Sequence, residues 1–240
     1  MIHARGILFT GLLLIAAAGA RAQQEPVHRP STDAELWLSI GTEVKPFKKK
    51  SGQVIERKFN KRFRALGELG YRGNENLTSS KLTYTVVGFN YRLLKFLRVG
   101  AEHRYNFRDK FTSNSHRVDV NARVAGEWGR FSGDYRAIVQ HEFIPPIRYR
   151  TILRNRFALE YNIPKWRFDP QVTMETFTAL HHTGNRLIGL RYGMGTTFAL
   201  DEKKKRHVID VSLRHDREQN MPGLKYRWIW ALAYEYRWGK

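Results

Sequence analysis

The chain has 240 residues, with 42 lysine and arginine residues against 22 aspartate and glutamate residues, a net charge of +20 and no cysteine. This length is enough for one large domain or two small ones, and the lack of cysteine excludes a small disulfide-held scaffold. The charge alone would suit nucleic acid, anionic lipid headgroups or an acidic polysaccharide, so the location of the protein decides among these partners.

The first 22 residues, MIHARGILFTGLLLIAAAGARA, have the three-part layout of a secretory signal peptide. Arg5 precedes an apolar run from Gly6 to Gly19, and small residues follow at Ala20 and Ala22. The run is shorter than the ~20 apolar residues of a membrane anchor, so we expect cleavage after Ala22. The exported chain would keep 40 basic and 22 acidic residues, a net charge of +18, and nucleic acid is then not an expected partner.

Residues 23–33, QQEPVHRPSTD, are polar and contain prolines, which predicts a flexible lead-in. From residue 34 to 240 no apolar run approaches the length of a membrane helix, and polar and apolar residues alternate with a period of two. We therefore expect one all-β domain over 34–240. The candidate strands are 35–45, 57–72, 81–92, 97–108, 116–128, 131–143, 149–163, 168–180, 185–200, 207–216 and 226–238.

The segment 116–128, HRVDVNARVAGEW, shows this alternation most clearly. One face carries charged and amide side chains, and the other carries aliphatic ones that end in an aromatic ring. The polar face is Arg117, Asp119, Asn121 and Arg123, and the apolar face is Val118, Val120, Ala122, Val124 and Trp128. The question is which face meets the surroundings of the protein.

Three features favour a lipid-facing apolar side. Many runs are eleven residues or longer, close to the ~9–11 that cross a bilayer at a tilt and above the ~5–6 of globular strands. Arginine outnumbers lysine on the polar faces, and its planar guanidinium suits interior ion pairs. Aromatic residues lie beside connections, as at a membrane interface, at Tyr91, Trp128, Phe131, Tyr161, Trp166, Phe198 and Trp238. A soluble barrel with an apolar interior is the alternative.

The prediction is therefore an antiparallel transmembrane β-barrel of about 10–12 strands, of the outer-membrane type. Short connections at 93–95, 129–130, 164–165 and 201–206 alternate with mostly longer ones at 73–81, 109–115, 144–148, 181–185 and 216–225, which predicts one periplasmic rim of short turns. Strands from 57–72 to the C-terminus then make a consistent set of ten. The segment 35–45 either has an undetected partner strand, which gives twelve, or is not a full crossing.

Short motifs along most of the chain resemble those of one protein family. They are Trp37, Glu68 with Arg72, Gly88 with Asn90-Tyr91-Arg92, Asn155-Arg156-Phe157, Glu175 with Phe177, and Asn185-Arg186 followed by Gly189. In order and spacing they resemble an uncharacterised outer-membrane β-barrel family, domain of unknown function 2490. Two family motifs are altered here, to His116-Arg117 and to a displaced Gln140-His141-Glu142. The resemblance implies an outer-membrane barrel and no established reaction.

If the polar faces point inward, their charges would form an ion-pair ladder in the lumen. The candidate residues are Glu68, Arg72, Arg104, Arg117, Asp119, Arg123, Arg136, Glu142, Arg154, Arg156, Glu160, Glu175, Arg191 and Arg214. Such a ladder is a polar core in a purely structural barrel. It is also compatible with a small pore or binding lumen, in which the excess of arginine would favour anions.

The sequence predicts no catalytic residue, cofactor or metal site. A phospholipase-like His-x-Ser stretch does not occur, Ser115 and His116 are adjacent and so would point to opposite faces of a strand, and His181-His182 have no nearby carboxylate. A lipid-modifying hydrolase and a soluble exported barrel that binds an anionic lipid or polysaccharide stay open as alternatives. The expected location is the outer membrane of a Gram-negative cell, with outer-membrane lipids, lipopolysaccharide and the barrel-assembly machinery as partners. Cargo, lumen opening and oligomeric state stay undetermined.

Overall fold

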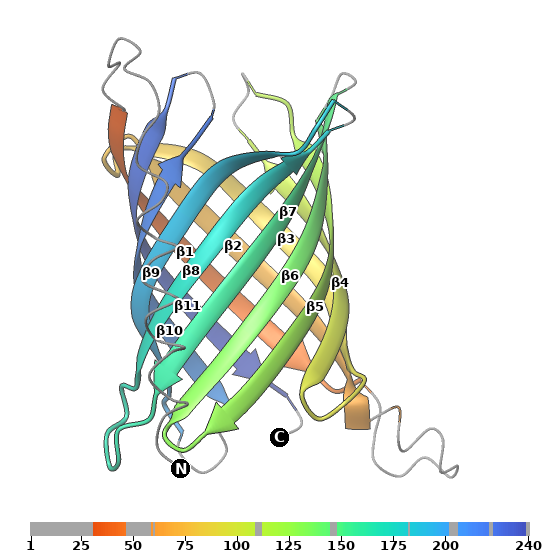
Figure 1. The fold of residues 1–240 in the computed structure, drawn as a ribbon, viewed down its shortest axis with the longest axis vertical. Helices are drawn as coiled ribbons and strands as arrows, with labels where there is room; N and C mark the ends of the chain where they lie inside the picture. Colours follow the sequence, from red (N-terminus) through yellow and green to blue (C-terminus); the bar gives the residue numbers. More distant parts are fainter. Residues whose placement is uncertain are drawn as a thin grey trace, which may run out of the picture.

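The computed structural model describes residues 31–46, 59, 61–108, 112–144, 148–181, 183–201, 206–220 and 223–238, in which eleven strands close into one barrel (Figure 1). The all-β barrel prediction is confirmed, and eleven lies within the predicted range. The strands are β1 (Ser31–Val44), β2 (Phe63–Asn74), β3 (Ser79–Arg92), β4 (Leu97–Phe107), β5 (Ser115–Trp128), β6 (Phe131–Ile144), β7 (Arg148–Tyr161), β8 (Pro170–Leu180), β9 (Arg186–Ala199), β10 (His207–Glu218) and β11 (Lys225–Arg237).

Strands that follow one another in the chain pair antiparallel, and β1 pairs parallel with β11 to close the barrel. The parallel register runs from Ser31 opposite Lys225 to Glu43 opposite Arg237. Both interpretations of 35–45 were wrong, because β1 is a full-length strand and the described residues contain no twelfth one. Parallel closure permits an odd strand number. It also draws residues 31–33 of the predicted lead-in into the barrel, while the predicted signal segment lies outside the described residues.

The barrel has two rims, which we name by the end of the chain. At the C-terminal rim, at the bottom of Figure 1, lie the ends of β1, β3, β5, β7, β9 and β11 and the connections 93–96, 129–130 and 162–169. At the opposite rim lie the start of β1, the connection 75–78 and the ends of β2, β4, β6, β8 and β10. The prediction of one rim of short turns was wrong, because the C-terminal rim carries both the two-residue connection 129–130 and the eight-residue connection 162–169, while the connection 75–78 at the opposite rim has only four residues.

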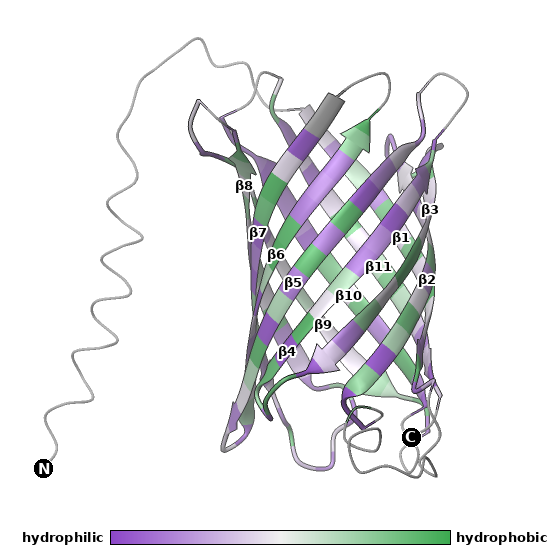
Figure 2. Ribbon diagram, turned by 90° about the vertical axis from the view of Figure 1, so that its right-hand side faces the viewer, coloured by the Kyte–Doolittle hydropathy of each residue, from purple (hydrophilic) through white to green (hydrophobic). Residues whose placement is uncertain are grey.

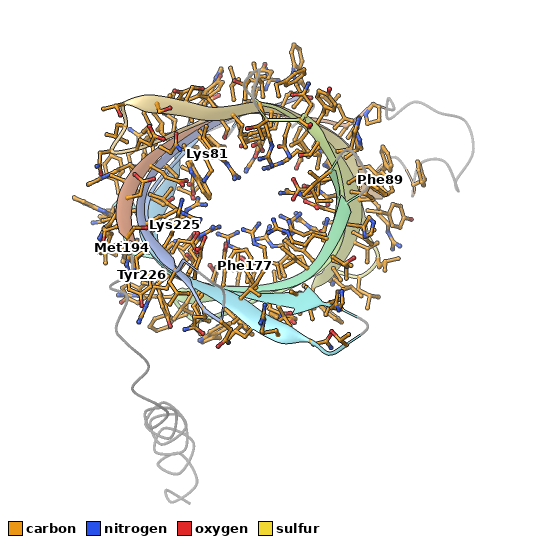
Figure 3. The ribbon with its side chains drawn as sticks, turned by 90° about the horizontal axis from the view of Figure 1, so that it is seen from above. Lys81, Phe89, Phe177, Met194, Lys225 and Tyr226 are labelled. Carbon is orange, nitrogen blue, oxygen red and sulfur yellow. The ribbon has the colours of Figure 1, made fainter. Side chains whose placement is uncertain are left out.

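The wall of the barrel is polar inside and apolar outside. On β5, Asp119 is 4% exposed whereas its neighbour Val120 is 57% exposed. Polar and apolar residues alternate along the strands in Figure 2. In Figure 3, seen along the barrel, Phe89 and Met194 point outward while nitrogen-bearing side chains point into the lumen. The period-two pattern therefore describes an inverted barrel, with its charged rows buried.

A small apolar cluster breaks the polar interior at β2 and β3. Leu82, Tyr84 and Val86 are buried there, with Leu66 packed against them. The ring of Tyr84 lies across Gly70, where an added Cβ would come within 2.1 Å of the Tyr84 Cζ atom. Gly70 therefore leaves the space that this aromatic ring needs on the neighbouring strand. The Tyr84 hydroxyl donates a hydrogen bond to Glu68 Oε1 at 2.6 Å.

Candidate functional site in the barrel lumen

Cross-strand register places charged residues from β1 and β3–β11 in one continuous row on the lumen wall. Each member lies directly opposite the next, in the order Arg92, Arg98, Arg123, Arg136, Arg156, Glu175, Arg191, Asp216, Arg227 and Asp33. The row climbs from Arg92 at the C-terminal rim to Asp33 near the opposite rim. Its first half is entirely arginine, and its second half alternates in sign. Like charges directly opposite each other destabilise a sheet. The arginine half of the row is therefore repulsive between neighbouring strands, whereas the alternating half is attractive.

Glu175, at the middle of β8, is the centre of the alternating half. Its carboxylate lies 2.8 Å from Arg154 Nη2, 3.5 Å from Arg156 Nε and 3.2 Å from Arg191 Nη1. Arg154 Nη2 donates to both carboxylate oxygens, at 2.8 and 2.9 Å. Glu175 is only 3% exposed, so water does not replace these donors. One carboxylate is thus shared by three arginines on β7 and β9.

From Glu175 the ion pairs continue across the parallel seam. Arg191 contacts Asp216 at 2.9 Å, and Asp216 contacts Arg227 at 3.2 Å. Arg227 reaches Glu35 on β1 at 3.5 Å, and Lys81 on β3 binds the same carboxylate at 2.6 Å. We call the connected set the ion-pair chain: Arg154, Arg156, Glu175, Arg191, Asp216, Arg227, Glu35 and Lys81. It links seven strands and ties the first strand to the last.

A second charged cluster lies near the opposite rim. Glu142 on β6 contacts Arg108 at 3.4 Å and Arg150 at 3.3 Å, and it accepts a hydrogen bond from Ser115 Oγ at 2.9 Å. Asn106 Nδ2 donates to that hydroxyl at 2.9 Å. Together with the ion-pair chain, this cluster places paired charges on the lumen wall between mid-height and the opposite rim.

Some lumen arginines lie on aromatic rings. The Arg72 guanidinium lies 4.0 Å from the centroid of the Trp37 ring, and that of Arg104 lies 3.9 Å from the centroid of Tyr84. Neither arginine forms an ion pair with a described residue. The ring faces attract cations through their quadrupole, which stabilises these two charges without a carboxylate. Trp37 itself points inward, and its Nε1 donates to Glu35 at 2.7 Å.

The structure distributes the predicted ladder residues over four environments. Pairs within the prediction are Arg117 with Asp119, and Arg154, Arg156 and Arg191 with Glu175. Pairs with other residues are Arg123 with Asp134, Arg136 with Glu102, Glu142 with Arg108 and Arg150, and Arg214 with Asp210. Aromatic residues contact three more: Glu68 accepts a hydrogen bond from the Tyr84 hydroxyl, and Arg72 and Arg104 lie over aromatic rings. Among the described residues Glu160 has no ion-pair partner.

Sequence reasoning missed Glu35, Lys81, Asp216 and Arg227, the part of the ion-pair chain around the seam. The alternation of β10 and β11 does place Asp216 beside Arg214 and Arg227 with Glu235 on polar faces. Their role depends on the β1–β11 pairing, for which the local pattern carries no signal.

Two cavities occupy the lumen near the C-terminal rim. The first, which we call the vestibule, is a cavity of about 460 Å³ between β1–β6 and β11. A second cavity of about 460 Å³ shares Arg98 and Arg123 with it. Both cavities thus lie in the part of the lumen next to the C-terminal rim, and the ion-pair chain and the Glu142 cluster lie farther toward the opposite rim.

Hydrolytic chemistry is not supported at the adjacent Ser115 and His116. Ser115 is buried in the lumen, whereas His116 is exposed and contacts His103 on the outer side, with 3.3 Å between ring nitrogens. A nucleophile and its base must lie within hydrogen-bond reach, so this pair cannot act together. His181 Nδ1 contacts Thr183 Oγ1 at 2.8 Å, and His182 lies outside the described residues.

Over the described ranges, no group of three or more histidine, aspartate or glutamate residues could hold a metal ion. The same ranges contain no helix long and apolar enough to cross a membrane. No protein-family model and no curated protein matches the chain. The resemblance to domain of unknown function 2490 stays a prediction.

Proposed function

We propose that this chain is an integral outer-membrane β-barrel whose arginine-rich lumen passes small anions in preference to cations. The inverted polarity of the wall carries the membrane part of this proposal. Every strand exposes large apolar side chains on its outer face, for example Val87, Val120, Met194 and Trp230. A water-soluble barrel would expose an apolar area far above the few hundred Å² that is usual, whereas lipid would cover it.

Aromatic side chains at both rims support the same placement. Trp128, Trp166 and Trp238 are exposed at the C-terminal rim, and Phe107 and Trp228 are exposed near the opposite one. Outer-membrane barrels carry such aromatic girdles at the two interfaces, on either side of an apolar band. Outer-membrane lipids and lipopolysaccharide would then be the surroundings of the barrel, and the assembly machinery would insert it.

The charge of the lumen supports a preference for anions. Five arginines stand opposite one another on β3 to β7, and rings of fixed positive charge favour anions in a pore. Side chains project into the lumen (Figure 3), so the proposal is limited to small solutes. The ion-pair chain also favours a second candidate function, that of a structural barrel that conducts no ions.

Fractionation followed by conductance tests the proposal. We expect the protein to fractionate with outer membranes, to need detergent for release and to show heat-modifiable gel mobility. In planar bilayers under a KCl gradient, the reversal potential should have the sign of a chloride-selective pore. Arg98→Glu, which inverts a charge lining both cavities, should shift that potential toward cation selectivity, and Arg217→Glu on the outer face should not.

The opposite outcomes separate the alternatives. Release without detergent would contradict the membrane placement and favour the soluble barrel. Folded, inserted protein that gives no conductance would leave the structural barrel. Degradation of labelled phospholipid by the purified protein would favour the lipid-modifying hydrolase.

A further inference from the structure

Each acidic residue that lines the vestibule already has an ion-pair or hydrogen-bond partner. Glu43 contacts Arg64 at 3.2 Å, and Glu102 contacts Arg136 at 2.5 Å. Glu235 is paired with Arg237, and Glu68 accepts the Tyr84 hydroxyl. Each carboxylate that lines the cavity therefore already has a donor of its own, and none is left for other cations on this wall.

Two arginines of the same wall have no ion-pair partner among the described residues. Arg92 and Arg98 line the vestibule from β3 and β4, and they stand directly opposite each other across the antiparallel pair. Within the described residues neither side chain forms an ion pair or a hydrogen bond. The next residue of the row, Arg123, uses one guanidinium nitrogen on Asp134 at 2.9 Å, and its buried Nε has no partner. Adjacent like charges repel, so a bound anion would remove an unfavourable contact.

A buried amide adds a neutral donor beside these arginines. Asn121 lies two residues deeper than Arg123 on the same face of β5, is 5% exposed, and its Nδ2 has no hydrogen-bond partner among the described residues. It lines the vestibule next to Gly100, where an added Cβ would lie 3.2 Å from that nitrogen and 2.2 Å from Asn90 Oδ1. The missing side chain at Gly100 thus lets the amides of β3 and β5 approach each other on the wall.

We propose that the vestibule is a binding site for a phosphate group, with Arg92, Arg98 and Arg123 as charged donors and Asn121 as the neutral one. Guanidinium groups match the paired oxygens of an oxyanion in a way that a halide cannot use. The volume of about 460 Å³ exceeds that of phosphate alone, so a phosphate ester fits as well. This inference goes beyond the proposed pore, because binding does not require that the lumen conduct.

Binding is measured on the full chain folded in detergent micelles, by isothermal titration with inorganic phosphate and with glycerol 3-phosphate in a chloride buffer. We expect one saturable site for at least one of the two. Arg92→Gln/Arg98→Gln should weaken binding at least tenfold. Asn121→Leu, which keeps the size but removes the donor, should weaken it about tenfold because a hydrogen bond to a charged group is lost. Tighter binding of the ester would assign the site to an organic phosphate, and equal binding to the free ion.

The control is Arg186→Gln/Arg217→Gln, which removes the same charge at the opposite rim, and it should bind like the wild type. Heat-modifiable mobility and circular dichroism show that each variant is folded. Equal weakening in the control, displacement by chloride at equal concentration, or no saturable binding to folded wild-type protein would each overturn the proposal. The pore is judged separately, since phosphate binding without conductance refutes only the pore, and conductance without binding refutes only this site.

Discussion

Glu175→Ala is expected to lower the free energy of unfolding by about 3 kcal/mol, the lower end of the cost of breaking a buried ion pair. The carboxylate is 3% exposed and is shared by Arg154, Arg156 and Arg191. Its removal leaves three guanidinium groups in repulsion across β7 and β9, with Asp216 as the nearest acid of the row for one of them. Urea unfolding in lipid vesicles, followed by tryptophan fluorescence, measures the change.

Glu160→Ala is the matched control for this prediction. It removes the same group from the lumen face of the neighbouring strand, and Glu160 forms no ion pair with any described residue. We expect a change within about 0.5 kcal/mol, as for substitutions away from specific interactions. Equal destabilisation by the two variants would show that the ion-pair chain does not hold the barrel together.

Val120→Arg is expected to impair insertion by roughly 2–4 kcal/mol, the cost of a basic side chain on the lipid face near the bilayer midplane. Val120 lies midway along β5 and is among the most exposed apolar residues of the wall. The cost arises because the guanidinium would lose its water without gaining a partner. The yield of folded, heat-modifiable protein and its unfolding midpoint in vesicles provide the measurement.

Leu97→Arg is the depth control, because Leu97 begins β4 at the C-terminal rim and the cost falls to ~0–1 kcal/mol near an interface. A soluble barrel would behave differently, since an exposed position in water tolerates arginine within about 0.5 kcal/mol. If Val120→Arg left insertion and stability unchanged, this result would therefore contradict the membrane placement, whatever the conductance experiments show.

The local pattern was sufficient for the orientation of most lumen residues. In 116–128 the period of two separates Asp119 from Val120, and the structure buries the first and exposes the second. The pattern carries this information because successive side chains of a strand point to opposite faces. It could not show that Arg72 and Arg104 would rest on the rings of Trp37 and Tyr84, because those contacts join different strands at a register that no single segment encodes.

By itself, therefore, the sequence determined the all-β class and the approximate strand positions, which follow from alternation within single strands. The strand lengths and the excess of arginine over lysine on the polar faces favoured an inward polar face. Only the tertiary structure decided how the barrel closes. The parallel pairing of β1 with β11 makes eleven strands sufficient and brings Glu35 within reach of Arg227 and Lys81. The antiparallel register of β3 and β4 sets Arg92 opposite Arg98. Which carboxylate pairs with which arginine, and which arginines are left without one, depends on distances between strands, which the alternation within a single strand does not encode.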